Sequence, residues 1–278
     1  MKLTFAFLCC LLANPEVVET KLEQVHPVPK LKPIMERSPG QTRAIVLIHG
    51  LNIVASKTKV HQALFHDWQL PKGHLVQALS KNADVFAFAY AQNAPLTTIS
   101  QLPALADGVQ RLKFLGYDEI ILVGHSAGGV LARMFVEDNP QAGVTRVLQV
   151  DAPNLGSSWI KIDIVAKKDQ DPFLQSLSKD ERMKCCLRRQ DKKIPANVEF
   201  LCIVGASNSL GDGLVSFASQ WPEDLQFQGI PAIRINANHY MMVRSQKTAE
   251  RIAELARQSQ PRWTDEERLT RKKLVLGN

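Results

Sequence analysis

Cysteine is scarce in this chain, with five residues in 278, and two of them lie within the first ten positions. The other three include the adjacent pair Cys185 and Cys186, and adjacent cysteines rarely bond to each other. No cysteine spacing suggests a metal site, so we expect no metal. Cys202 lies in an apolar run and is expected to be a buried thiol of the core. Internal repeats and low-complexity tracts are absent as well.

An apolar run long enough to cross a membrane is missing at the start of the chain, where one would be most expected. Met1 and Lys2 are followed by an apolar stretch at residues 3–13, which is too short for a spanning helix. A charged start and a short apolar core are typical of an export signal. We therefore predict a leader at residues 1–13 and an exported protein, which is secreted, periplasmic or membrane-associated. A cytoplasmic chain with an apolar start is the alternative.

Strand-like and helix-like patterns alternate along the rest of the chain. Short apolar, β-branched runs predict strands, and apolar residues at helical spacing predict helices between them. The strands are expected at 44–48, 84–90, 119–123, 144–150, 198–205 and 230–236, and the helices at 103–115, 129–136 and 247–258. This alternation predicts an α/β domain with a mostly parallel central sheet and helices on both faces. The domain is expected to span residues 44–260, with a proline-bearing arm at 14–43 before it and a charged tail at 261–278 after it.

The most informative motif is Gly-His-Ser-Ala-Gly at residues 124–128, which matches G-x-S-x-G. It lies between a predicted strand and a predicted helix, which is the context of a nucleophile elbow. In such an elbow a sharp turn lifts the hydroxyl of Ser126 clear of the sheet, and the next N–H lies at a helix start. The pentapeptide also occurs by chance as a glycine-rich turn, so its partners decide between the two interpretations.

A serine nucleophile needs a base to accept its proton and an acid to orient that base. With the chain order serine, acid, histidine, His239 is the one candidate base, because it alone of the seven histidines follows Ser126. It lies in a loop after the last predicted strand, and an ordinary surface histidine is the alternative.

The acid is expected after the strand that precedes the histidine loop. We favour Asp212, which lies between two glycines in the loop after residues 198–205, although an ordinary Asp-Gly turn has the same appearance. Asp151, directly after another strand, and Asp224 are its rivals.

Two backbone N–H groups are expected to stabilise an oxyanion near the serine. One belongs to Ala127 in the elbow. The other belongs to Leu51, because the strand at 44–48 runs into His49 and Gly50, and the glycine lets the chain bend sharply. We expect His49 to be a packed loop residue and His125 to fill the elbow, with neither acting as the base.

These segments resemble the α/β-hydrolase superfamily, and within it the lipase and GPI inositol-deacylase-like branch. The resemblance rests on residues 48–51, 123–133, 151–157 and 211–215, and it spans 44–239. It implies an α/β-hydrolase fold with Ser126 as nucleophile, Asp212 as acid and His239 as base. It also implies oxyanion donors at Leu51 and Ala127. Asp151 departs from the pattern, since many relatives have threonine there.

Positive charge is concentrated between two core strands, at residues 159–195, where such hydrolases carry a lid. The segment contains ten basic and six acidic residues, a net charge of +4 in a chain whose formal net charge is +7. With apolar residues interleaved, this segment predicts a lid or cap insertion that meets an acidic or lipid interface. A solvated helical cap is the alternative. We do not expect nucleic-acid binding, because no recognised binding motif accompanies the charge.

Taken together, the motifs predict a serine hydrolase that cleaves carboxylic esters, such as lipid or acyl esters, through an acyl-enzyme. That chemistry needs no cofactor. An acyltransferase with the same site is one alternative, and a catalytically inactive scaffold that binds a lipid or a partner protein is another. The sequence does not indicate an oligomeric state.

Overall fold

The computed structural model describes residues 18–31, 34–52, 57–158 and 168–277. The predicted leader at 1–13 and the first part of the predicted lid, at 159–167, lie outside the described residues. Within the described ranges, no helix has both the length and the apolar character needed to cross a membrane.

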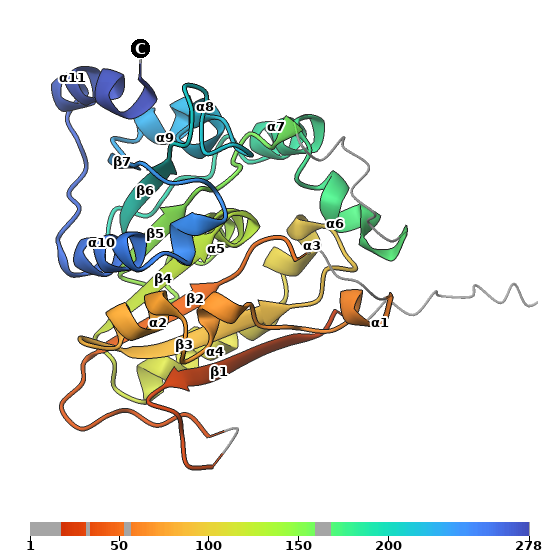
Figure 1. The fold of residues 1–278 in the computed structure, drawn as a ribbon, viewed down its shortest axis with the longest axis vertical. Helices are drawn as coiled ribbons and strands as arrows, with labels where there is room; N and C mark the ends of the chain where they lie inside the picture. Colours follow the sequence, from red (N-terminus) through yellow and green to blue (C-terminus); the bar gives the residue numbers. More distant parts are fainter. Residues whose placement is uncertain (1–17, 32–33, 53–56, 159–167, 278) are drawn as a thin grey trace, which may run out of the picture.

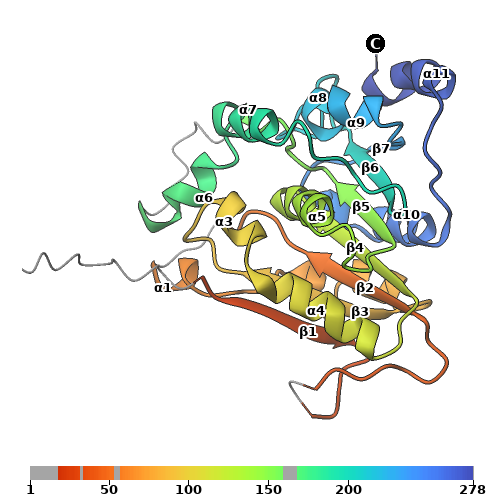
Figure 2. The same cartoon turned by 180° about the vertical axis from the view of Figure 1, so that it is seen from behind.

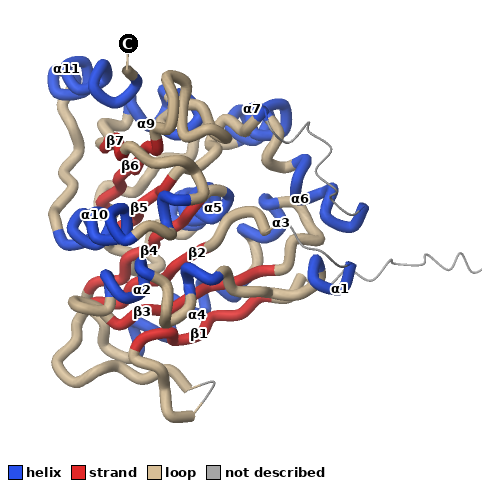
Figure 3. Tube along the Cα trace, in the orientation of Figure 1, coloured by secondary structure: helices blue, strands red, loops and turns tan. Residues whose placement is uncertain are grey.

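A seven-stranded sheet forms the centre of the molecule, with the strand order β1-β3-β2-β4-β5-β6-β7. Strands β2 to β7 pair in parallel, and β1 pairs with β3 in the antiparallel direction. Figure 3 shows the strands side by side through the middle of the fold. The strands are β1 (Thr20–His26), β2 (Arg43–Ile48), β3 (Asp84–Tyr90), β4 (Glu119–His125), β5 (Arg146–Val150), β6 (Glu199–Gly205) and β7 (Ala232–Ile235).

Helices cover both faces of this sheet. Helices α2 (His74–Leu79) and α10 (Gln246–Arg257) lie on the face seen in Figure 1, and α4 (Pro103–Phe114) and α5 (Ala127–Asp138) lie on the face seen in Figure 2. The other helices are α1 (Lys57–Val60), α3 (Leu96–Ser100), α6 (Asp171–Gln175), α7 (Lys179–Arg188), α8 (Phe217–Gln220), α9 (Glu223–Phe227) and α11 (Asp265–Leu276). Short 3-10 turns are η1 (Asp67–Gln69), η3 (Lys168–Gln170) and η4 (Met241–Val243).

The alternation of side chains along β2 shows why two cores form. Val46 and Ile48 point into the core that contains α4 and α5. Ile45 and Leu47 point into the core that contains α2 and α10. All four side chains are buried, as expected for a parallel strand that is covered on both faces.

The predicted alternation of strands and helices is confirmed, and the structure adds order where the sequence analysis expected an arm and a tail. Residues 20–26 of the arm form β1, an edge strand that was missed because its only apolar residues are Leu22 and Val25. Part of the charged tail forms α11, which begins with a capping box between Thr264 and Glu267. The described part of the insertion, from residue 168, consists of η3, α6 and α7.

Candidate active site

Ser126 lies in a sharp turn between the end of β4 and the start of α5. Its backbone has φ 56° and ψ −126°, a region that residues other than glycine seldom adopt and that costs about 1–3 kcal/mol. Its N–H donates to the carbonyl of Val150 at 2.8 Å, and its carbonyl accepts from the N–H of Gly129 at 2.9 Å. The predicted strand–turn–helix context of the elbow is therefore present, with the strained residue at the serine.

Close backbone packing explains the glycine at position 128. A Cβ on Gly128 would lie 2.3 Å from the carbonyl oxygen of Ile48 and 2.4 Å from that of His49. These distances are far below van der Waals contact, so the elbow can pack against the end of β2 only when residue 128 lacks a side chain. The same packing brings the loop after β2 next to Ser126.

His239 and Asp212 are joined by a hydrogen bond, although they come from different loops. The Nδ1 atom of His239 lies 2.7 Å from Oδ2 of Asp212. The other oxygen of Asp212 accepts the backbone N–H groups of Leu214 and Val215 at 2.8 and 2.7 Å. The carboxylate is buried and fixed on both sides, and it holds the imidazole with Nδ1 as the protonated nitrogen.

The two rival acids occupy different positions. Asp224 forms an ion pair with Arg133, which uses its charge elsewhere. Asp151 lies closer to the site, with Oδ2 at 3.9 Å from Nδ1 of His239. The structure therefore brings Asp212 into hydrogen-bond contact with the histidine and places Asp151 just beyond that range.

A mostly apolar pocket of about 620 Å³ is lined by three of the five predicted site residues. Ser126, His239 and Leu51 all line it. The remaining lining residues are Asn52, Phe65, His66, Asp67, His125, Pro153, Ser157, Leu177, Leu214, Val215, Tyr240 and Arg244. Leu177 belongs to the insertion between β5 and β6, so that insertion forms part of the pocket wall.

The loop after β2 approaches Ser126 at Gly50. A Cβ on Gly50 would lie 2.5 Å from Cβ and 3.0 Å from Oγ of Ser126. Among the described residues, the N–H groups of Leu51 and Ala127 have no hydrogen-bond acceptor. Both expected oxyanion donors are therefore unpaired, one beside the serine and one at the first position of α5.

Two side chains fix the orientation of the Gly50–Leu51 peptide. The carbonyl of Gly50 accepts from Nδ1 of His49 at 2.8 Å and from Nε2 of Gln92 at 2.9 Å. Because C=O and N–H point in opposite directions across a trans peptide, the Leu51 N–H points away from both donors. His49 and Gln92 therefore orient the second expected oxyanion donor.

His49 is held in the tautomer that this role requires. Its Nε2 accepts the N–H of Tyr90 at 3.3 Å, so the ring proton is on Nδ1. Burial lowers the pKa of His49 to about 4, and the ring is stacked between His66 and Tyr90. The prediction that His49 is a packed residue and not a base agrees with this arrangement.

Gln92 also connects the loop after β2 to the insertion between β5 and β6. Its Oε1 accepts from the N–H of Asn52 at 3.0 Å and from Nε2 of Gln170 at 2.9 Å, and Gln170 donates to the carbonyl of Asn52 at 2.7 Å. Gln92 and Gln170 are both buried. The sequence analysis missed both, although Gln92 lies just after the carboxyl end of β3, at the edge where polar residues reach a site.

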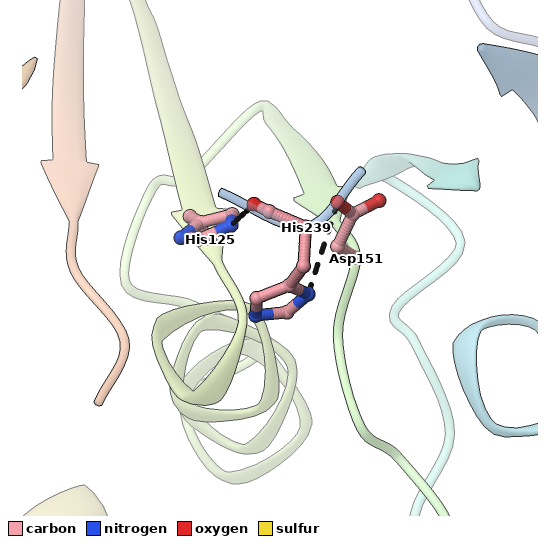
Figure 4. Close-up of side chains that lie close together, drawn as sticks. All are labelled: His125, Asp151 and His239. Carbon is pink, nitrogen blue, oxygen red and sulfur yellow. Dashed lines mark hydrogen bonds and ion pairs between the residues drawn. The ribbon is translucent and has the colours of Figure 1, made fainter. Parts of the chain in front are cut away.

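His125, Asp151 and His239 form a compact group, drawn in Figure 4, and both histidines line the pocket. One ligand atom from each lies within 4.8 Å of the others, as in a metal site. However, Nε2 of His125 lies 3.0 Å from the carbonyl oxygen of His239. A carbonyl only accepts, so this nitrogen carries a proton and has no lone pair for a metal. Burial, followed by the nearby His239, holds the pKa of His125 well below its usual value, and the ring is a neutral donor.

The model of a family described as an alpha/beta hydrolase of unknown function, DUF915, matches residues 113–244. No curated protein matches the chain.

Several solved structures are similar to this one in fold. The mature form of the lipase BlEst2 from Bacillus licheniformis has a TM-score of 0.60 at 14% identity, covering 87% of this chain and 98% of that one. The metagenomic carboxyl esterase MGS0156 has a TM-score of 0.51 at 17% identity, with 88% and 80% covered. A lipase-esterase related protein from Clostridium acetobutylicum has a TM-score of 0.50 at 11% identity, with 86% and 98% covered. Together with the parallel sheet and the strained serine turn, these matches show that the chain has the α/β-hydrolase fold.

Proposed function

We propose that the protein is a serine hydrolase that cleaves carboxylic esters through an acyl-enzyme. The observation that carries this proposal is the 2.7 Å hydrogen bond between His239 and Asp212 in a pocket that also contains Ser126 on its strained turn. The mostly apolar lining suits an acyl chain. The similar structures include a lipase and a carboxyl esterase, which supports the same chemistry.

In this mechanism Ser126 attacks the ester carbonyl while His239 accepts its proton. The negative charge that develops on the carbonyl oxygen is stabilised by the N–H groups of Leu51 and Ala127. His239 then returns the proton to the leaving alcohol, and water releases the acyl group by the same steps in reverse. Asp212 holds the imidazole and stabilises its positive form.

Three further features of the proposal come from the sequence. The segment at 159–195 acts as a lid at a lipid interface, the protein is exported through its leader, and its substrates resemble those of the GPI inositol-deacylase-like branch. The wall contact of Leu177 supports a role of the insertion at the pocket. A panel of p-nitrophenyl esters of rising chain length, with and without detergent, tests both the lid and the acyl preference.

The direct test of the proposed function is labelling with a fluorophosphonate probe followed by peptide mapping. We expect the label on Ser126 of the wild type and its loss in His239→Ala, because the hydroxyl is a poor nucleophile without its base. His74→Ala is the matched control, since His74 is exposed on α2, and it is expected to label normally. Label on another residue, or equal labelling of His239→Ala, contradicts the proposal.

Gln92→Met is expected to lower kcat about 10-fold with little change in KM. The variant keeps the length of the side chain but loses the donor to the Gly50 carbonyl, so the Leu51 N–H is less well oriented for the transition state. Steady-state kinetics on one p-nitrophenyl ester measure the effect. Gln77→Met, at an exposed position of α2, is the control. An unchanged kcat for Gln92→Met would show that this amide does not orient the donor.

A further inference from the structure

Asp151 is the most unusual acidic residue of the fold. It follows β5 directly, its side chain is completely buried, and its backbone has φ 51°. Among the described residues neither carboxyl oxygen makes a hydrogen bond of good geometry, and its nearest polar neighbours are the Gly205 backbone and the Asp212 carboxyl group. A buried carboxylate without a partner is strongly unfavourable, and left-handed backbone at a residue other than glycine adds strain. Such features persist where the surrounding structure holds them in place.

The surroundings of Asp151 do leave room for a carboxyl group at this point. A Cβ on Gly205, the last residue of β6, would lie 2.6 Å from Oδ1 of Asp151 and 2.9 Å from Cβ of Asp212. The backbone of Asp151 is held in turn by a bond from its N–H to the carbonyl of Ile203 at 3.0 Å. The end of β6 therefore accommodates both acids side by side.

Both carboxyl groups face one atom, Nδ1 of His239. Asp212 lies 2.7 Å from it and Asp151 lies 3.9 Å from it, as Figure 4 shows for Asp151. The three residues come from neighbouring strand ends, because β5, β6 and β7 are adjacent in the sheet. A small movement would bring the second carboxyl group into hydrogen-bond range.

The charges around Asp151 disfavour its ionisation beside Asp212. Burial, together with the negative charge of Asp212, raises the pKa of Asp151 well above its usual value. The other titratable groups facing it are His239, from the loop after β7, and His125, from β4, which is neutral. A second negative charge so close to a buried carboxylate is unfavourable, so the neutral form of Asp151 is favoured while Asp212 accepts from His239.

We propose that Asp151 and Asp212 act as a pair at His239, in which Asp151 is a positioning residue that takes over as acceptor of the Nδ1–H when the charge of Asp212 is removed. In that event Asp151 releases its proton to solvent and becomes the single negative charge beside the imidazole. This inference rests on the proposed function, since it concerns the acid of the same site.

The test compares four forms of the protein on one p-nitrophenyl ester: wild type, Asp151→Asn, Asp212→Ala and the double variant. Asparagine suits position 151 because it tolerates left-handed backbone and resembles a neutral acid. We expect Asp212→Ala to lose about 100-fold in kcat, because its replacement acceptor lies more than 1 Å further away. The double variant is expected to lose about 10⁴-fold, as expected when no acid remains, and Asp151→Asn is expected to lose less than Asp212→Ala.

The pH profile separates positioning from a purely structural role. In Asp212→Ala, activity requires an ionised Asp151. Burial still raises the pKa of Asp151 after the charge of Asp212 is gone, so the acidic limb of kcat/KM is expected at higher pH than in the wild type. Asp212→Ser is a second variant, because its hydroxyl can still accept the N–H groups of Leu214 and Val215 and keep the loop folded. It is expected to behave as Asp212→Ala does.

The proposed role of Asp151 is contradicted if Asp212→Ala and Asp212→Ser are as inactive as the double variant. It is also contradicted if the acidic limbs of their kcat/KM profiles lie at the same pH as in the wild type. Ser126→Ala is measured alongside. If Ser126→Ala keeps full activity, the proposed function fails instead. An inactive Ser126→Ala together with equal single and double acid variants contradicts the pair alone.

Discussion

Replacing Ser126 with alanine is expected to lower kcat for ester hydrolysis by about 10⁶-fold. The hydroxyl is the only group that the proposed mechanism uses to form the acyl-enzyme, and no other step can replace that bond. The loss corresponds to about 8 kcal/mol of transition-state stabilisation. The oxyanion donors stay in place, so a small residual rate above the uncatalysed reaction is expected. Steady-state kinetics on p-nitrophenyl esters of rising chain length measure it.

Two controls make this result specific to the nucleophile. Ser80→Ala, at the end of α2, is expected to keep wild-type kinetics, because its hydroxyl only bonds to the carbonyl of Gln77. The thermal unfolding midpoint of Ser126→Ala should show that the fold is intact. A folded Ser126→Ala enzyme with wild-type kcat would rule out the acyl-enzyme at this serine. If the wild type itself hydrolyses no ester, the inactive-scaffold alternative applies.

The sequence predicts the serine turn and its histidine because each leaves a local signal. The elbow combines a β-branched run, closely spaced glycines and a helical pattern, and β4 and α5 form there. His239 is the only histidine after Ser126, so chain order alone selects it. Asp212 was favoured by its loop position, and the structure places it 2.7 Å from His239.

Long-range contacts decide what the sequence could not predict. The sequence analysis named Asp151 as a rival acid but did not predict that it lies beside Asp212 at the same histidine. That placement follows from the neighbouring strands β5, β6 and β7, and nothing local shows how closely two strand ends approach. The roles of His49 and Gln92 depend on one carbonyl oxygen, that of Gly50, to which both donate. Gln92 and Gly50 are 42 residues apart in the chain, and they meet because β2 and β3 pair side by side in the sheet.

The edge strand shows the same limit for the fold. Residues 20–26 contain two apolar side chains, and most of their positions are only partly buried. Their stability comes from pairing with β3 and not from a local hydrophobic pattern. The central strands, in contrast, are covered on both faces and were predicted from their continuous apolar, β-branched runs.

Gly50→Ala is expected to lower kcat by about 10²–10³-fold. The added Cβ would lie 2.5 Å from Cβ of Ser126 and 2.9 Å from the carbonyl oxygen of His125. Because these partners belong to the rigid turn at the end of β4, the loop after β2 must move instead. Its movement breaks the bonds that His49 and Gln92 make to the Gly50 carbonyl and carries the Leu51 N–H away from the serine.

The size of that loss tests whether the loop after β2 supplies an oxyanion donor at all. Gly108→Ala is the matched control, since Gly108 is a buried glycine in α4 whose added Cβ would meet only the side chain of Leu22, and it is expected to leave kcat unchanged. Removing a donor acts on the transition state more than on bound substrate, so kcat should fall while KM changes little. A Gly50→Ala enzyme with wild-type kcat would show that the loop yields freely and that the Leu51 N–H does not stabilise the oxyanion. A rise in KM with an unchanged kcat would instead assign the loop to substrate binding.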